Sequence, residues 1–510
     1  MSNPPRRLPP RAPGIPVALG LAVALLGAAC SRSIPPPPEV AERPLRVALH
    51  AEPASLDPHL QSESVANSLL SNLYEGLTSF DGEMRLRPAL AERWESPDDL
   101  TWILRLRRGT SFHDGRPVTA ADVLYSFGRA RDHAASRVSS FLVAVESWRA
   151  LDDATLELRT LRPYPILLNK LALVMIVPAG SPDPIVEPVG TGPYRLAARG
   201  PGRLELAPVA GHWSGAPPHA RVDFTFEPDV ARRASGLLAG EFDLVTELGP
   251  GERGRVAASP LAAVLERDTL TVNYLQLPGD LPPFDDPRVR EAISLAIDRE
   301  RLVAEMAGGL GAPEGQMVGP NVFGHVVDLD APARDLVRAR RLLAEAGYAT
   351  GLMVDLHFRE GRSLDPLVRQ LAGAGIGVRQ IPGRWGELYP RLQSGAPLFY
   401  FGGWSCTSGD ASDLFDGKVH SRNPLTGYGS QQGRVLSTPL LDRLIEIAGS
   451  ASDMGERRRT LEQAMRELMA HRMLLPLFVP RTQYGVRRDL AFEPRLDGHV
   501  RAAEIRWRSR

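Results

Sequence analysis

The sequence predicts an α/β protein with two large lobes, because of its length and the way strand and helix patterns alternate along it. Single hydrophobic cores stop growing at roughly 250 to 300 residues, and this chain has 510. Segments that alternate apolar and polar residues, as half-buried strands do, are interleaved with segments whose apolar residues recur at helical spacing. The chain should therefore divide into two α/β lobes.

The charge composition is balanced and excludes some classes of partner. The chain has 60 basic and 60 acidic residues, so no basic surface for nucleic acid or for an anionic membrane is predicted. Lys170 and Lys418 are the only lysines. We attribute this arginine preference to genomic base composition and attach no function to it.

The first thirty residues read as an export signal. The segment begins with the positive residues Arg6, Arg7 and Arg11. A short apolar run, Val17 to Leu26, follows, and the small residues Gly27 to Ala29 then precede Cys30. The apolar run is too short to span a bilayer. This arrangement resembles a bacterial lipoprotein processing site, so residues 1–30 are expected to be a signal peptide ending at the acylated Cys30. The alternative is ordinary cleavage, with Cys30 incidental. Residues 31–44, with four consecutive prolines, would form a stiff spacer.

The pattern after the spacer begins with a strand and a helix. We expect a strand at Leu45–Leu49, a helix within Ser62–Leu73 and a strand at Trp102–Leu106. A turn is expected at His113-Asp114-Gly115, and Thr119 with Asp122 forms a capping box at the start of a further helix.

Later segments repeat this alternation. Asp286-Pro287 begins a helix whose apolar face continues through Ile293 and Ile297 and which Gly308-Gly309 ends. A second helix is expected from Leu336 to Ala346, ending at Gly347. The strands expected in this part are Val222–Phe226, Val354–Phe358 and the buried Leu398–Phe401.

Several short blocks occur in an order and spacing typical of one family. They are Leu56-Asp57-Pro58, residues 73–77 (LYEGL), 88–94 (PALAERW), 104–126 with Phe112-His113-Asp114-Gly115, 190–194 (GTGPY), 240–243 (GEFD), 286–292 (DPRVREA), 342–348 (LLAEAGY) and 475–478 (LPLF). Through them the chain resembles the family 5 extracellular solute-binding proteins, the oligopeptide, dipeptide and nickel binding group, over essentially everything after the spacer.

The resemblance implies a bilobal, periplasmic-binding-protein-like fold. Residues 45–270 and 481–510 would form a discontinuous first lobe, and residues 271–480 would form the second. Two crossing segments, near Val272-Asn273-Tyr274 and near Phe478-Val479-Pro480, would act as the hinge about which the lobes close on a ligand.

Motifs that suggest catalysis or metal binding have structural explanations. The Asp114-Gly115 pair is read as a turn, and Gly190-Thr191-Gly192-Pro193 lacks the Lys and Ser/Thr of a phosphate loop. Gly403-Trp404-Ser405-Cys406-Thr407 lacks the final glycine of a nucleophile elbow. The histidines show no H-E-x-x-H spacing. A nickel chelate bound as a ligand is kept as an alternative. We therefore expect no enzyme, no catalytic residue, no metal site and no cofactor.

The resemblance places the ligand-contacting segment around Trp404. In the family a tryptophan lines the cleft, and an aspartate three residues later takes the ligand's ammonium group; here that position is Thr407. The nearest carboxylate is Asp410, followed by Asp413 and Asp416. Either Asp410 substitutes, or the ligand is uncharged at that end, as a blocked peptide or an oligosaccharide would be. The expected ligand-binding residues are Trp404, Ser405, Cys406, Thr407, Asp410, Tyr274 and Tyr428.

The aromatic residues before Trp404 divide between core and cleft. Phe399 and Phe401 are expected in a buried strand, and Trp404 is expected to face the ligand. Cys30 and Cys406 are the only cysteines, so no disulfide within the folded part is expected.

The function expected from the resemblance is that of a monomeric, periplasmic or cell-envelope lipoprotein. It would be held at the membrane by its lipid anchor only, and it would deliver a peptide or similar polar ligand to an ABC permease and ATPase complex. The alternatives left open are an oligosaccharide or metal-chelate receptor, and a sensor or scaffold that uses the same cleft without transport.

Overall fold

The computed structural model describes residues 43–431, 436–451 and 453–508. The predicted signal peptide, Cys30 and most of the proline-rich spacer lie outside these residues. No helix in the described ranges is long and apolar enough to cross a membrane.

A twelve-stranded mixed sheet runs through the described chain, in the order β16-β15-β17-β13-β18-β11-β1-β10-β9-β8, with β12 and β14 also paired to β18. Its strands are β1 (Leu45–Leu49), β8 (Tyr194–Gly200), β9 (Arg203–Pro208), β10 (Val222–Phe226), β11 (Leu244–Thr246), β12 (Ala262–Asp268), β13 (Thr271–Gln276), β14 (Gly311–Pro313), β15 (Leu352–Arg359), β16 (Ile376–Gly383), β17 (Phe399–Ser405) and β18 (Leu474–Arg487). The strands predicted at residues 45–49, 222–226 and 354–358 are confirmed, and the strand predicted at 398–401 is found from Phe399 onward.

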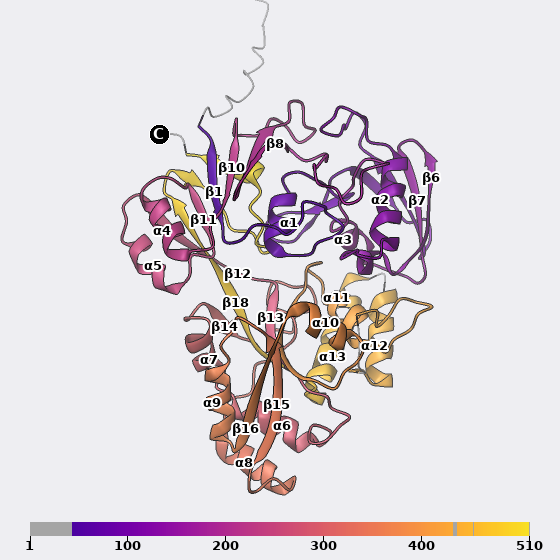
Figure 1. Ribbon diagram of the computed structural model, residues 1–510. Coiled ribbons are helices and arrows are strands. Elements are labelled where there is room, and N and C mark those ends of the chain that lie inside the picture. The colour runs from indigo at the N-terminus through magenta and orange to yellow at the C-terminus, as the bar shows by residue number, and fades with distance from the viewer. Residues whose placement is uncertain (1–42, 432–435, 452, 509–510) are drawn as a thin grey trace, which may run out of the picture. The chain divides into compact units, whose positions relative to one another are not determined.

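Strand β18 is shared by both parts of this sheet. It has 14 residues, and its second half pairs with β11 and β12. Its first half pairs with β13 and β14. Figure 1 shows β18 as a long strand running beside β13. The two segments predicted to cross between lobes thus belong to neighbouring strands.

Three smaller sheets complete the strand inventory of the described ranges. One has four strands in the order β4-β5-β7-β6, and the others are antiparallel pairs, β2 with β3 and β19 with β20. Their bounds are β2 (Thr78–Phe80), β3 (Leu86–Pro88), β4 (Ala91–Glu95), β5 (Thr101–Leu106), β6 (Val145–Asp152), β7 (Thr155–Thr160), β19 (Leu490–Ala491) and β20 (Arg506–Trp507).

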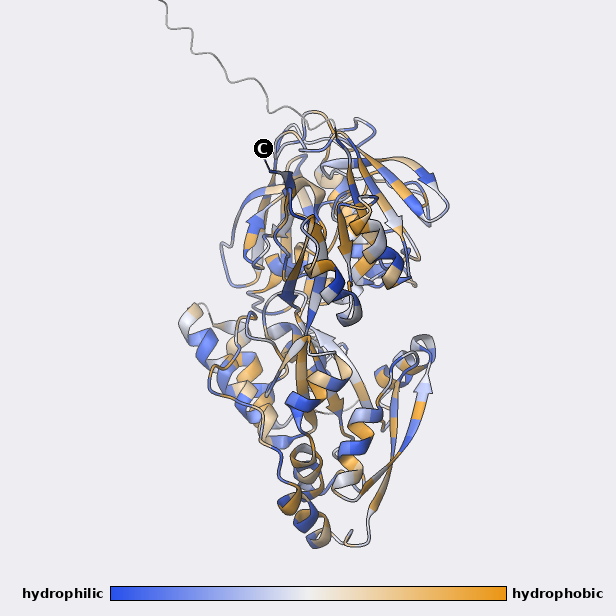
Figure 2. Cartoon of the chain, turned by 90° about the vertical axis from the view of Figure 1, so that its left-hand side faces the viewer, coloured by the Kyte–Doolittle hydropathy of each residue, from blue (hydrophilic) through white to orange (hydrophobic). Residues whose placement is uncertain are grey.

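The helices carry both hydrophobic and hydrophilic residues (Figure 2), as amphipathic helices packed on a sheet do. They are α1 (Ser64–Leu70), α2 (Ala120–Asp132), α3 (Leu167–Leu171), α4 (Val230–Leu238), α5 (Pro250–Ala257), α6 (Pro287–Ala296), α7 (Arg299–Met306), α8 (Leu336–Glu345), α9 (Asp365–Gly373), α10 (Trp385–Gln393), α11 (Ser412–Leu414), α12 (Pro439–Ser450) and α13 (Met454–His471), with short 3₁₀ turns η1 (Ser139–Leu142) and η3 (Ala502–Glu504) and a π-helical turn η2 (Phe415–Val419).

The helix predicted from Asp286 to Gly308 is in fact two helices. Asp286 caps α6 as expected, but α6 ends at Ala296. The Asp298 side chain then accepts a hydrogen bond from the backbone N–H of Arg301 and begins α7. An internal aspartate that can cap a new helix interrupts the apolar periodicity, and the single-helix prediction overlooked it.

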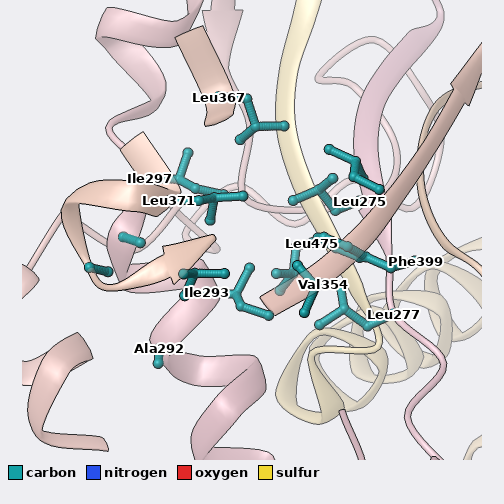
Figure 3. Close-up of a cluster of buried hydrophobic side chains, with 14 of the residues drawn as sticks. Leu275, Leu277, Ala292, Ile293, Ile297, Val354, Leu367, Leu371, Phe399 and Leu475 are labelled. Carbon is teal, nitrogen blue, oxygen red and sulfur yellow. The ribbon is translucent and has the colours of Figure 1, made fainter. Parts of the chain in front are cut away.

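The largest buried cluster lies where β13, β15, β17 and β18 meet the helices on one side of the sheet. Figure 3 shows Leu275, Val354 and Phe399 from the strands pointing toward Ile293 of α6 and Leu371 of α9. The buried positions of Phe399 and Phe401 agree with the prediction of a core strand.

The backbone of the segment Gly190–Pro193 packs closely against the backbone of Asn72 and Leu73. A Cβ at Gly192 would lie 2.5 Å from the carbonyl oxygen of Asn72. His113 bridges to the same loop, because its Nδ1 accepts a hydrogen bond from Gly190 N–H and its Nε2 donates to Gly192 O. Burial lowers the pKa of His113, which favours the neutral ring that this bridge requires. The His113-Asp114-Gly115 and Gly190-Thr191-Gly192-Pro193 motifs therefore both have a structural role.

We predict that Gly192→Ala destabilises the protein by about 1–3 kcal/mol, the usual cost of overpacking, because the new methyl group meets backbone atoms. Gly128→Ala is the matched control. Gly128 lies within α2, where a Cβ meets nothing within 4 Å, so this change should stabilise by about 0.5–1 kcal/mol. Urea unfolding of both variants measures the difference, and equal midpoints would contradict the assignment.

Candidate functional site

Side-chain alternation along β13 and β17 separates core residues from site residues. The two strands are antiparallel, with Tyr274 opposite Gly402 and Leu275 opposite Phe401. Opposed residues of such a pair project to the same face, and successive residues project to opposite faces. One face therefore carries the core residues Leu275, Phe399 and Phe401. The other, here called the β13–β17 face, carries Tyr274, Gln276, Tyr400, Gly402 and Trp404.

Gly402 leaves room on this face for the ring of Tyr400. A Cβ at Gly402 would collide with the ring of Tyr400, so any other residue would push that ring away. Trp404 is half-buried at the end of the strand, and its indole Nε1 is shielded from solvent without an acceptor in the described chain.

Lys418 lies above the β13–β17 face. Its Nζ donates to Gln276 Oε1 at 2.9 Å and lies 5.6 Å and 5.8 Å from the ring centroids of Tyr274 and Trp404. The side chain is half-buried, and this burial lowers the pKa of Lys418 to about 8. Within the described residues Lys418 forms no salt bridge with a carboxylate.

Asp410, the expected carboxylate of the site, already has a partner. Its Oδ1 and Oδ2 accept hydrogen bonds from Arg457 at 2.8 and 2.7 Å, and Oδ1 also accepts the backbone N–H of Ser412. The side chain is 5% exposed. Although burial opposes the charged form, Asp410 raises the pKa of Arg457. A ligand ammonium would have to share this carboxylate with Arg457.

The other two aspartates of the segment pair with residues far earlier in the chain. Asp416 Oδ2 accepts a hydrogen bond from Arg162 at 2.7 Å. Asp413 pairs with Lys170, and, against the effect of burial, this carboxylate raises the pKa of Lys170. These four side chains are all buried. In addition, Asn169 Nδ2 donates to Ser408 O at 2.8 Å.

The remaining predicted site residues fall into different environments. Ser405 is exposed, and Thr407 is half-buried with its hydroxyl 3.4 Å from Asp413 Oδ2. Cys406 is buried, and its Sγ donates to Asp410 O at 2.9 Å. Tyr428 is buried between the ring of His420 and the guanidinium of Arg162. Trp404 and Tyr274 thus lie on the β13–β17 face, where Trp404 is half-buried and Tyr274 is buried, and Cys406, Asp410 and Tyr428 are also buried.

Sequence reasoning missed the basic partners at this site. Lys170 and Lys418, the only lysines in the chain, both lie here, and Arg162 and Arg457 pair with the aspartates. The rarity of lysine was the one available signal, but the chain gives no indication of which arginines turn inward. No group of three or more His, Cys, Asp or Glu in the described part of the chain is arranged to hold a metal ion.

Comparison with solved structures defines the class of protein. HbpA2 from Haemophilus parasuis matches with a TM-score of 0.79 at 22% identity, covering 92% of this chain and 100% of that one. The periplasmic binding protein DppA from Helicobacter pylori, solved with the peptide STSA, matches with a TM-score of 0.78 at 23% identity, covering 92% and 98%. The fold is that of the periplasmic binding proteins, as predicted.

Sequence comparison defines the family. The family model of the bacterial extracellular solute-binding proteins, family 5 middle, matches residues 85–425. The glutathione-binding protein GsiB of Pectobacterium atrosepticum is 30% identical over 384 residues, which cover 70% of this chain and 73% of that protein. The chain belongs to the bacterial extracellular solute-binding proteins of family 5, which confirms the predicted resemblance.

We predict that Asp410→Asn lowers the free energy of unfolding by about 3–5 kcal/mol, because breaking a buried ion pair leaves Arg457 charged and unpaired. Asp355→Asn is the control, since its pair with Arg379 lies on the surface and exposed pairs contribute about 0–1 kcal/mol. Chemical denaturation monitored by circular dichroism compares the two. An Asp410→Asn variant as stable as Asp355→Asn would show that the Arg457 pair contributes little.

Proposed function

We propose that this protein is the substrate-binding component of an ABC importer and that it binds glutathione or another short peptide of similar size, without catalysis. Its relatives support this proposal, since GsiB is named a glutathione-binding protein and DppA is described as ABC transporter-associated and bound to a peptide. The proposed partners are a permease and its ATPase, and the proposed oligomeric state is a monomer.

The proposed lobes are those expected from the sequence. Residues 45–270 and 481–510 form the first lobe and residues 271–480 the second, with a hinge at Val272–Tyr274 and Phe478–Pro480. Two observations support these boundaries. The chain passes from β12 to β13 at residues 269–270, and β18 pairs with β12 on one side of Pro480 and with β13 on the other.

The buried ion pairs support closure of these lobes as the binding movement. Arg162 and Lys170 belong to the proposed first lobe, whereas Asp413 and Asp416 belong to the second. A charge pair that is buried only when two surfaces meet favours the closed form over the open one. Asp413 and Asp416 lie in α11 and η2, within twelve residues after Trp404 of β17, so the proposed ligand contact and the proposed contacts between lobes come from one short stretch of the chain.

We predict that reduced glutathione binds the full chain in calorimetric titration and decreases its radius of gyration in small-angle X-ray scattering, because closure brings the lobes together. Trp404→Ala should weaken binding about tenfold to a hundredfold, since covering an aromatic face is worth about 1–3 kcal/mol.

The control for this experiment is Trp385→Ala. Trp385 is exposed and stacks on Tyr389 in α10, so its loss should weaken glutathione binding far less than the loss of Trp404. Absence of binding by glutathione and by a panel of dipeptides would contradict the proposed ligand class. Binding at saturation without a change in the radius of gyration would contradict closure.

We also propose that Cys30, which lies outside the described residues, carries a lipid anchor that holds the protein at the cell envelope. The arginine-rich start, the short apolar run and the small residues before Cys30 support this proposal. Cys30→Ser should move the protein from the membrane fraction to the soluble fraction. Mass spectrometry of the wild type should show acyl groups, and their absence together with unchanged fractionation of the variant would exclude the anchor.

A further inference from the structure

Lys418 differs from the other inward-facing basic residues in having few acceptors. Lys170, Arg162 and Arg457 each face a carboxylate. Arg299 pairs with no acid among the described residues but donates to several oxygens, including the carbonyls of Pro476 and Pro332. Lys418 has three N–H donors, and the one acceptor found for them in the described ranges is the neutral Gln276 amide.

A second donor without an acceptor lies beside Lys418. The indole Nε1 of Trp404 is shielded from solvent and has no hydrogen-bond partner among the described residues, and the Lys418 ammonium lies 5.8 Å from the same tryptophan ring. The neighbours Tyr274 and Gln276 are uncharged. The β13–β17 face therefore presents one positive charge and an additional N–H donor, and no carboxylate among the described residues pairs with the charge.

The local backbone presents Lys418 in an unusual way. It lies in the π-helical turn η2, Phe415–Val419, a geometry that is rare and frequent at functional sites. Asp416 in the same turn faces Arg162, whereas Lys418 faces the β13–β17 face. The turn thus directs its acid toward the proposed first lobe and its base toward the aromatic residues.

A partly desolvated ammonium without a counter-ion is unfavourable for folding, so its position is best explained by a group that arrives from outside. A carboxylate fits, because its two oxygens can accept from two separate donors and it supplies the missing negative charge. Lysine suits such a point contact, whereas arginine would impose a planar bidentate geometry. We propose that Lys418 and the indole N–H of Trp404 bind a carboxylate of the ligand.

The sequence predicts that an acidic residue binds a positive group of the ligand, whereas in the proposed contact a basic residue binds a negative group. The family position for an acid that takes an ammonium is Thr407, and Asp410 is occupied by Arg457. Ligands of this protein are therefore selected for a negative group at the Trp404 end. The inference rests on the proposed function in that it treats this face as the ligand site.

Nuclear magnetic resonance can observe Lys418 directly, because protein labelled with ¹³C-lysine gives signals from only two residues, which the Lys418→Met variant assigns. Acetate should shift the Lys418 Cε signal and raise its titration midpoint, because the anion stabilises the ammonium, while acetamide should leave both unchanged. Reduced glutathione should act like acetate at lower concentration. The Lys170 signal serves as the internal reference.

Calorimetric titration then measures the contribution to affinity. Lys418→Met should weaken glutathione binding about tenfold to a hundredfold, the range for a hydrogen bond to a charged group. Glutathione diethyl ester, which lacks both carboxylates, should bind wild type and Lys418→Met equally. Arg108→Met removes a positive charge from an exposed position and should leave the affinity for glutathione unchanged.

A stability measurement separates this role from a structural one. Lys418→Met should leave the thermal midpoint of the free protein unchanged or raise it, because the variant removes a poorly paired charge from a half-buried position. A lower midpoint with unaltered glutathione affinity would overturn the assignment, and so would a Lys418 signal that neither acetate nor glutathione moves. If glutathione does not bind the wild type but acetate shifts the Lys418 signal, the result contradicts the proposed glutathione ligand and supports the carboxylate site.

Discussion

The antiparallel pairing of β13 with β17 determines both the core and the candidate site. Because side chains alternate across these strands, the same pairing that buries Leu275, Phe399 and Phe401 must turn Tyr274, Tyr400 and Trp404 to the opposite face. A slip of one residue in this register would exchange the two sets. The precision of the site therefore derives from the packing of the hydrophobic cluster behind it.

Most of the fold could be predicted because it depends on local patterns. The strands at Leu45–Leu49 and Val222–Phe226 follow from alternation, and the start of α2 follows from the Thr119 and Asp122 capping box. The break between α6 and α7 was missed because Asp298 caps a helix inside a continuous apolar pattern. Asp298 could either lie within one continuous helix or cap a second one. Tertiary packing decides between these outcomes, and a single sequence does not reveal that packing.

The candidate site was predicted less completely, for a related reason. The segment around Trp404 predicts that this residue faces the ligand, but the partner of a charged side chain depends on which distant segment lies opposite. Asp410 meets Arg457, 47 residues later, and Asp413 meets Lys170, 243 residues earlier. Such pairings depend on the completed topology. In an arginine-rich chain, charge alone does not indicate which arginine pairs with a given aspartate.

The environment of Cys406 has a consequence for redox chemistry. Burial raises the pKa of its thiol well above the usual value, its Sγ donates to a backbone oxygen, and the side chain has no exposed surface. Thiol–disulfide exchange requires an accessible thiolate, and Cys406 provides neither the ionised sulfur nor the access. The protein can therefore encounter thiols and disulfides in an oxidising compartment without forming mixed disulfides through this residue.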